Sequence, residues 1–228
     1  MASALVFRHV VLDLDGTLVD TKDDLAAAVN VTLAALGLPS QDPRTLLAYV
    51  GNGARVLLER ALGSAHGARI EEGLDVFMPW YREHLLDHAV IYGGLRAVLD
   101  RLAGERAVFS VLTNKPADMS AKILTGLGLD GLCPRLIGGD TLRVRKPDPT
   151  GLRQLIAAAE VAVPATLMVG DSAIDVATGR NAGVATCAVF WGFNGAAVRG
   201  AGADVEIAGP SELLSVCRHG LPNENVVY

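Results

Sequence analysis

The hydrophobic pattern divides the chain into a helical stretch and a stretch in which strands and helices alternate. The apolar run that ends at Val10-Val11-Leu12 stops abruptly at two acids, Asp13 and Asp15, and this pattern predicts a buried strand. From residue 21 to residue 89 the apolar positions recur at helical spacing, with Gly and Pro interruptions near 37–39 and 51–53. This pattern predicts a helical insertion of about seventy residues, a size that can pack as a small bundle.

The remainder of the chain alternates between short apolar runs and amphipathic segments. Strands are expected at 107–112, 132–137, 165–169, 184–190 and 205–208, and helices at 95–102, 117–127, 150–160, 173–182 and 211–217. Such alternation implies parallel strands with right-handed crossovers and helices on both faces. The predicted fold class is α/β, a doubly wound parallel sheet (a Rossmann-like core) with an inserted helical cap.

The expected domain boundaries follow from this division. The core domain comprises residues 1–16 and 92–228, and the cap domain comprises residues 17–91, inserted after the first strand. Tyr92, Gly93 and Gly94 resemble a hinge that returns the chain to the core. Residues 220–228 are expected to fray.

Polar residues cluster where the predicted strands end. Ligands of open parallel sheets bind beyond the carboxyl ends of the strands, so these side chains should meet at one edge. They are Asp13, Asp15, Thr113, Asn114, Lys146 and Asp171. A lone Asp-x-Asp is most often an ordinary strand exit, but the buried strand before it and Gly16-Thr17 after it favour a functional site.

The residue types at this edge point to phosphoryl transfer. Asp13, Asp15 and Asp171, with Asp175 one helical turn further on, form a hard oxygen site that suits Mg²⁺. Zinc would favour His or Cys ligands. The opposing donors are the hydroxyl of Thr113, the amide of Asn114 and the ammonium of Lys146. These groups complement a dianionic phosphoryl group.

Composition and charge narrow the class of partner. The net charge of −5 and the pI near 5.5 give no electrostatic footprint for nucleic acid or anionic lipid. No stretch has the length and apolarity of a membrane span, and Arg8 and His9 interrupt the N-terminal apolar run, which argues against a signal peptide. We therefore expect a cytoplasmic protein, monomeric or homodimeric, that binds a small phosphorylated metabolite. Its three cysteines are expected to be reduced.

Four ordered motifs resemble the haloacid dehalogenase superfamily of aspartate-nucleophile phosphatases, and within it the phosphoglycolate phosphatases. They are the segment 13–20, Thr113-Asn114-Lys115, Lys146-Pro147, and Gly170-Asp171-Ser172 with Asp175. The segments 51–53, 138–140 and 191–194 also look like that branch. The resemblance covers essentially the whole chain, although many relatives carry a proline near residues 92–94.

The resemblance implies a role for each motif residue. Asp13 would attack phosphorus to form an aspartyl phosphate, and Asp15 would act as general acid and then general base. Mg²⁺ would be held by Asp13, Asp171 and the backbone carbonyl of Asp15. The phosphoryl oxygens would be bound by Thr113, Asn114 and Lys146, with Asp175 and Ser172 in support. The implied reaction is hydrolysis of 2-phosphoglycolate to glycolate and phosphate.

Two alternatives stay open at this point. The same core could serve a sugar phosphomutase or a phosphatase of another small metabolite, because only the cap would differ. A non-enzyme alternative is a phosphoaccepting receiver-like domain, which also uses an acidic edge, a Thr and a Lys. Its usual length and the separation of its acids on different strands fit this chain less well.

The cap is expected to supply specificity through a second anion site. Gly51, Asn52 and Gly53 offer a helix start whose free N–H groups favour an anion. Arg55 could add a bidentate partner for a carboxylate. The competing interpretation of Arg55 is a solvated surface arginine.

Overall fold

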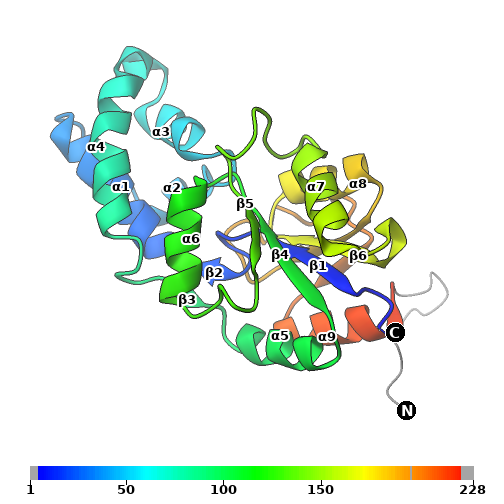
Figure 1. Ribbon diagram of the computed structural model, residues 1–228. Helices are drawn as coiled ribbons and strands as arrows, with labels where there is room; N and C mark the ends of the chain where they lie inside the picture. Colours follow the sequence, from blue (N-terminus) through cyan, green and yellow to red (C-terminus); the bar gives the residue numbers. More distant parts are fainter. Residues whose placement is uncertain (1–4, 196, 222–228) are drawn as a thin grey trace.

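A parallel sheet of six strands lies at the centre of the protein (Figure 1), in a computed structural model that describes residues 5–195 and 197–221. The strand order is β5-β4-β1-β6-β7-β8. The strands are β1 (His9–Leu12), β4 (Val108–Leu112), β5 (Arg135–Ile137), β6 (Thr166–Gly170), β7 (Ala185–Val189) and β8 (Val205–Ile207). This is the doubly wound order, so the predicted fold class is confirmed.

Helices cover both faces of the sheet. On one face lie α5 (Leu95–Gly104), α6 (Ala117–Gly126) and α9 (Pro210–His219), and on the other lie α7 (Thr150–Ala159) and α8 (Ala173–Ala182). Val10 and Leu12 of β1 belong to the hydrophobic core on the side of α5, α6 and α9, whereas Val11 packs with Leu152 and Leu155 of α7 on the other side. This alternation of period two gives β1 two buried faces, as its continuous apolar sequence predicts.

The insertion after β1 forms a helical body beside the sheet (Figure 1). It contains α1 (Lys22–Ala35), α2 (Pro43–Leu47), α3 (Ala54–Leu62), a 3₁₀ helix (Ser64–Arg69) and α4 (Ile70–Glu83). These elements agree with the helical periodicity of the sequence. Amphipathic α4 packs against α1 and α3, and its Phe77 and Tyr81 are buried. We call this helical body the cap.

A two-stranded ribbon joins the cap to the core. Its strands, β2 (Val19–Asp20) and β3 (Val90–Ile91), pair antiparallel. Two-residue strands leave too short a pattern to be found in the sequence, and neither was predicted. The expected hinge at residues 92–94 follows β3 directly.

Three further expectations concern the whole chain. In the described ranges 5–195 and 197–221, no helix combines the length and apolarity needed to cross a membrane. Cys133, Cys187 and Cys217 are free and buried, and burial raises the pKa of the Cys133 and Cys217 thiols to about 12. They therefore behave as small apolar side chains. The segment expected to fray, 220–228, falls mostly outside the described residues, which end at Leu221.

Candidate active site

The topology of the sheet brings the first and fourth motifs together. Strand order reverses between β1 and β6, where Leu12 pairs in register with Val169. Asp13 follows β1 and donates its backbone N–H to Val169 O at 3.0 Å, and Asp171 follows β6. Ligands bind at such a switch point because neighbouring crossovers leave a crevice there. The two acids are therefore placed at the expected edge by backbone pairing alone.

Three buried carboxylates form an acidic cluster at this crevice. Oxygen atoms of Asp13, Asp171 and Asp175 lie within 4.8 Å of one another. Burial raises the pKa of Asp13 to about 7, with Lys146 opposing the shift and Asp175 adding to it. Burial and the neighbouring carboxylates raise the pKa of Asp171 to about 8. A divalent cation would relieve this repulsion, and a set of carboxylate oxygens is the donor set that hard cations prefer.

Lys146, from the third motif, forms ion pairs with residues of the first and fourth motifs. Its Nζ lies 2.8 Å from Oδ1 of Asp13 and 2.6 Å from Oδ1 of Asp175. Burial works to lower the pKa of Lys146, but the two carboxylates outweigh it, so the pKa is raised. The ammonium therefore stays charged beside Asp13, where a phosphoryl group would need a cation.

Asp175 is a support rather than a free ligand. Its second oxygen accepts bonds from Oγ of Ser172 at 2.6 Å and from the Ser172 N–H at 3.2 Å, a capping box that begins α8. With both oxygens engaged by Lys146 and Ser172, Asp175 positions the lysine. Asp13 and Asp171 are then the carboxylates best placed to hold a metal ion.

The loop at residues 191–194 packs closely against Asp171 at Gly192. A Cβ on Gly192 would lie 2.1 Å from the Gly16 carbonyl oxygen and 2.4 Å from Cβ of Asp171. The carboxylate of Asp171 accepts the Asn194 N–H at 3.2 Å. Only a residue without a side chain lets this loop approach so closely. The segment 191–194 thus fixes the orientation of Asp171.

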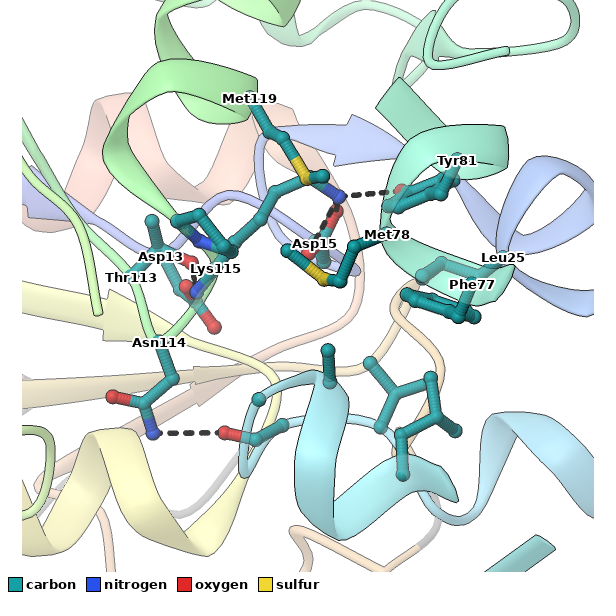
Figure 2. Close-up of a pocket in the computed structure, with 16 residues that line it drawn as sticks. Asp13, Asp15, Leu25, Phe77, Met78, Tyr81, Thr113, Asn114, Lys115 and Met119 are labelled. Carbon is teal, nitrogen blue, oxygen red and sulfur yellow. Dashed lines mark hydrogen bonds and ion pairs between the residues drawn. The ribbon is translucent and has the colours of Figure 1, made fainter. Parts of the chain in front are cut away.

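Asp15 faces away from the acidic cluster and toward the cap. Its Oδ1 accepts the hydroxyl of Thr21 at 2.6 Å, and Lys115 Nζ lies 3.0 and 3.2 Å from its two oxygens. The hydroxyl of Tyr81, from cap helix α4, also contacts Lys115 (Figure 2). The two acids of the first motif therefore have separate cationic partners, Lys146 for Asp13 and Lys115 for Asp15.

Thr113 and Asn114 of the second motif differ in their contacts. Thr113 is buried at the end of β4, and its hydroxyl accepts the Lys115 N–H at 3.2 Å while remaining able to donate. The side chain of Asn114, expected to bind phosphate, instead bonds backbone groups. Its amide donates to Gly51 O at 3.0 Å and to Lys146 O at 3.2 Å, and its carbonyl accepts Lys146 N–H at 3.1 Å. Asn114 thus positions Lys146 and connects the core to the cap.

A cavity separates the cap from the core at this site (Figure 2). Its core side is formed mainly by Asp13, Asp15, Thr113, Asn114 and Lys115, and its cap side mainly by Leu25, Val50, Leu57, Phe77, Met78 and Tyr81. The polar groups thus converge from the sheet edge, and apolar cap side chains face them. This is the usual composition of a small-molecule site.

Of the four cap residues expected to provide specificity, two line the cavity and two do not. Gly51 and Gly53 line the cavity, and Gly53 has the positive φ of 86° that the turn before α3 requires. Asn52 and Arg55 are not among the lining residues. Arg55 instead pairs with Glu71 at 2.8 Å, with 47% and 73% of the two side chains exposed. The surface interpretation of Arg55 therefore agrees with the structure, and we do not retain it as a carboxylate ligand.

Two polar residues of the cavity, Lys115 and Tyr81, had no assigned role in the sequence prediction. Lys115 belongs to the Thr-Asn-Lys motif, but a lysine beside a strand exit resembles a surface residue until its burial is known. Tyr81 sits on the apolar face of α4, where it cannot be told from an ordinary core position. The motif could have indicated Lys115, whereas nothing in the local sequence indicates Tyr81.

The fold and the site define the class of protein. Residues 10–189 match the model of the haloacid dehalogenase-like hydrolases, and the chain belongs to this family. It is therefore an enzyme of the hydrolase class, as predicted. The match spans the acidic cluster, Lys146 and the cap insertion, and it favours the hydrolase prediction over the receiver-like alternative.

Within this family, the chain is similar to several proteins named phosphoglycolate phosphatase. The chain is 37% identical over 218 residues to a phosphoglycolate phosphatase of Chromobacterium violaceum, covering 93% of this chain and 97% of the relative. A phosphoglycolate phosphatase of Pseudomonas syringae pv. tomato is 40% identical over 193 residues, covering 82% and 71%. A crystal structure from Haemophilus somnus, described as a predicted phosphoglycolate phosphatase, superposes with a TM-score of 0.86 at 28% identity and covers 92% and 97%. The predicted resemblance is confirmed.

Proposed function

We propose that the protein is a Mg²⁺-dependent phosphatase that hydrolyses 2-phosphoglycolate to glycolate and phosphate. The observation that carries the proposal is the carboxylate of Asp13, which lines the cavity beside Lys146 and within the acidic cluster. Curated relatives named phosphoglycolate phosphatase, at 37% and 40% identity, support the substrate.

The chemistry uses two carboxylates in sequence. Asp13 attacks phosphorus, and the bond from phosphorus to the leaving alcohol oxygen breaks to give an aspartyl phosphate. Asp15 supplies the proton that the leaving oxygen needs. Asp15 then removes a proton from the water that attacks the aspartyl phosphate, so phosphate leaves and Asp13 is restored.

The surrounding groups stabilise charge on the phosphoryl oxygens. Lys146 places its ammonium beside Asp13, and Thr113 offers a hydroxyl at the end of the neighbouring strand. Asp13 and Asp171, with the backbone carbonyl of Asp15, would hold the metal ion. When bound, Mg²⁺ supplies positive charge that neutralises the transferring phosphoryl group.

The cap has the position of a lid over the cavity. Residues 17–91, the expected cap domain, would move on the β2–β3 ribbon to admit substrate and exclude water. The bonds from Asn114 to Gly51 and from Lys115 to Tyr81 join the two bodies when the lid is closed. The same proposal includes a cytoplasmic location, a monomeric or homodimeric state and a small phosphorylated metabolite as the partner.

A steady-state panel tests the substrate. Purified protein with Mg²⁺ should show its highest kcat/KM on phosphoglycolate among phosphoglycolate, glucose 1-phosphate, glucose 6-phosphate and p-nitrophenyl phosphate. A preference for a sugar phosphate, or isomerisation of one, would support the phosphomutase alternative. Stable phosphorylation of Asp13 with no turnover on any ester would contradict a phosphatase.

A further inference from the structure

The cavity contains one positive charge that the reaction scheme does not use. Among the described residues that line it, Lys115 is the only positively charged side chain. Lys115 is 6% exposed, so its ammonium is held away from bulk water. A buried ammonium in a substrate cavity needs anionic partners, and it attracts them more strongly than a solvated lysine does.

The cap offers no competing cation at this position. Apart from the Tyr81 hydroxyl, the cap side chains that line the cavity are apolar. Arg55 pairs with Glu71 on the surface. Arg145, whose guanidinium approaches Gly53, is exposed and does not line the cavity.

The place of Lys115 relative to Asp15 defines what it can reach. A general acid must lie within hydrogen-bonding distance of the leaving oxygen, so that oxygen sits beside Asp15. Nζ of Lys115 is 3.0 Å from Oδ1 of Asp15. A group on the carbon that bears the leaving oxygen would therefore lie next to the ammonium. In phosphoglycolate, that group is the carboxylate.

The donor count of the ammonium leaves room for this carboxylate. An ammonium group has three N–H donors. Nζ lies 3.0 and 3.2 Å from the two oxygens of Asp15 and also contacts the Tyr81 hydroxyl. Because the two Asp15 oxygens lie at similar distances, they can share one N–H, and a substrate carboxylate can then accept the third N–H in a charge-assisted bond.

We propose that Lys115 is the specificity residue that binds the carboxylate of the substrate. This inference rests on the proposed phosphatase function and extends it to a substrate class. The class comprises phosphate monoesters that carry a carboxylate on the carbon bonded to the ester oxygen. Specificity would then reside in the core, one residue from Asn114, and the cap would contribute shape and exclusion of water.

The test compares two substrates that differ in one charge. Phosphoglycolate and its amide, 2-phosphoglycolamide, have nearly the same size, but the amide lacks the carboxylate. The wild-type enzyme should favour phosphoglycolate in kcat/KM by about 10- to 100-fold, the range expected for one charge-assisted contact. Lys115→Met should bring the ratio near unity, and Lys115→Arg should retain much of it.

Controls separate substrate binding from an effect on Asp15. Lys122→Met removes an exposed lysine of α6 and should leave the ratio unchanged. An equal loss on both substrates in Lys115→Met would show that Lys115 acts only through Asp15, and would overturn the proposal. If Lys115→Met does not fold, the wild-type ratio still decides, because a ratio near unity excludes a carboxylate contact. Failure of the wild-type enzyme to hydrolyse any ester would instead refute the proposed function.

Discussion

The ammonium nitrogen of Lys146 lies 2.8 Å from Oδ1 of Asp13, and both side chains are almost completely buried. The pair joins the first motif to a loop 133 positions later in the chain. Because the lysine also bonds Asp175, it retains an anionic partner if Asp13 loses its charge. The nucleophile can therefore be changed without leaving a buried ammonium alone.

Replacement of the proposed nucleophile should abolish turnover and leave the fold intact. In Asp13→Asn the amide oxygen can still accept the Leu14 N–H, a bond of 2.7 Å in the wild-type protein, but an amide cannot attack phosphorus. We expect activity below about 1% of wild type, a loss of at least 10²-fold. Thermal unfolding monitored by circular dichroism should show a folded protein. The control is Asp100→Asn, a surface partner of Arg96. Residual activity of several per cent would exclude Asp13 as nucleophile.

Replacement of Asp15 should block proton transfer and spare nucleophilic attack. With p-nitrophenyl phosphate the leaving group needs no acid, so Asp15→Asn should release p-nitrophenolate in a burst and accumulate the aspartyl phosphate. Steady turnover should fall by about 10²- to 10⁴-fold, since the variant also lacks the base for the second step. Rapid-quench kinetics measure the burst, and Asp13→Asn should show none. Absence of a burst in Asp15→Asn would remove the assigned role.

Metal removal should silence the enzyme and make its stability depend on pH. Without a cation the carboxyls of Asp13 and Asp171 have pKa values raised to about 7 and 8, against an ordinary value of 3.8. Between pH 3.8 and about pH 8, the folded state therefore binds protons that the unfolded state has lost. Their contribution to stability is therefore present at low pH and is lost as pH rises toward 8.

Melting curves in chelator and in Mg²⁺ test this behaviour. Mg²⁺ binds only the folded state, so it should restore activity and raise Tm, more at pH 8 than at pH 6. Asp171→Asn removes one raised carboxyl, so its stability in chelator should depend less on pH than that of the wild-type protein. Full activity in chelator, or an identical Mg²⁺ shift in Asp171→Asn, would contradict the metal site.

A single methyl group at the loop beside Asp171 should be enough to damage the site. In Gly192→Ala the new Cβ would lie 2.1 Å from the Gly16 carbonyl oxygen, a distance at which backbone must move. We expect a loss of about 1–3 kcal/mol of stability and a large fall in kcat. Gly104→Ala is the matched control, because a Cβ at that exposed end of α5 meets nothing within 4 Å. Equal stability of the two variants would refute the close contact.

The sequence predicted the parts of the site that backbone periodicity determines. Strand β1 ends just before Asp13 and β6 ends just before Asp171 because apolar runs stop there, and parallel strands bring such ends to one edge. The helices of the cap were also predictable, because their apolar positions recur at helical spacing.

Side-chain direction could not be predicted in the same way. Asn114 and Thr113 are adjacent in the sequence and both line the cavity, but the amide of Asn114 is already engaged by backbone groups of Gly51 and Lys146. Arg55 lies on a helix whose start lines the cavity, yet its rotation about that helix directs it to Glu71. Such outcomes depend on packing between segments distant in sequence, which no local pattern encodes.

The two-residue strands β2 and β3 have a consequence for how such enzymes diversify. Val19 pairs with Ile91 and Asp20 with Val90, so the chain leaves the core and returns to it at neighbouring points. A replacement segment grafted between Asp20 and Val90 would need only to match this one short span, with every strand of the six-stranded sheet left uncut. The lid could therefore be exchanged as a unit, while the strand ends that carry Asp13, Thr113 and Asp171 stay in place.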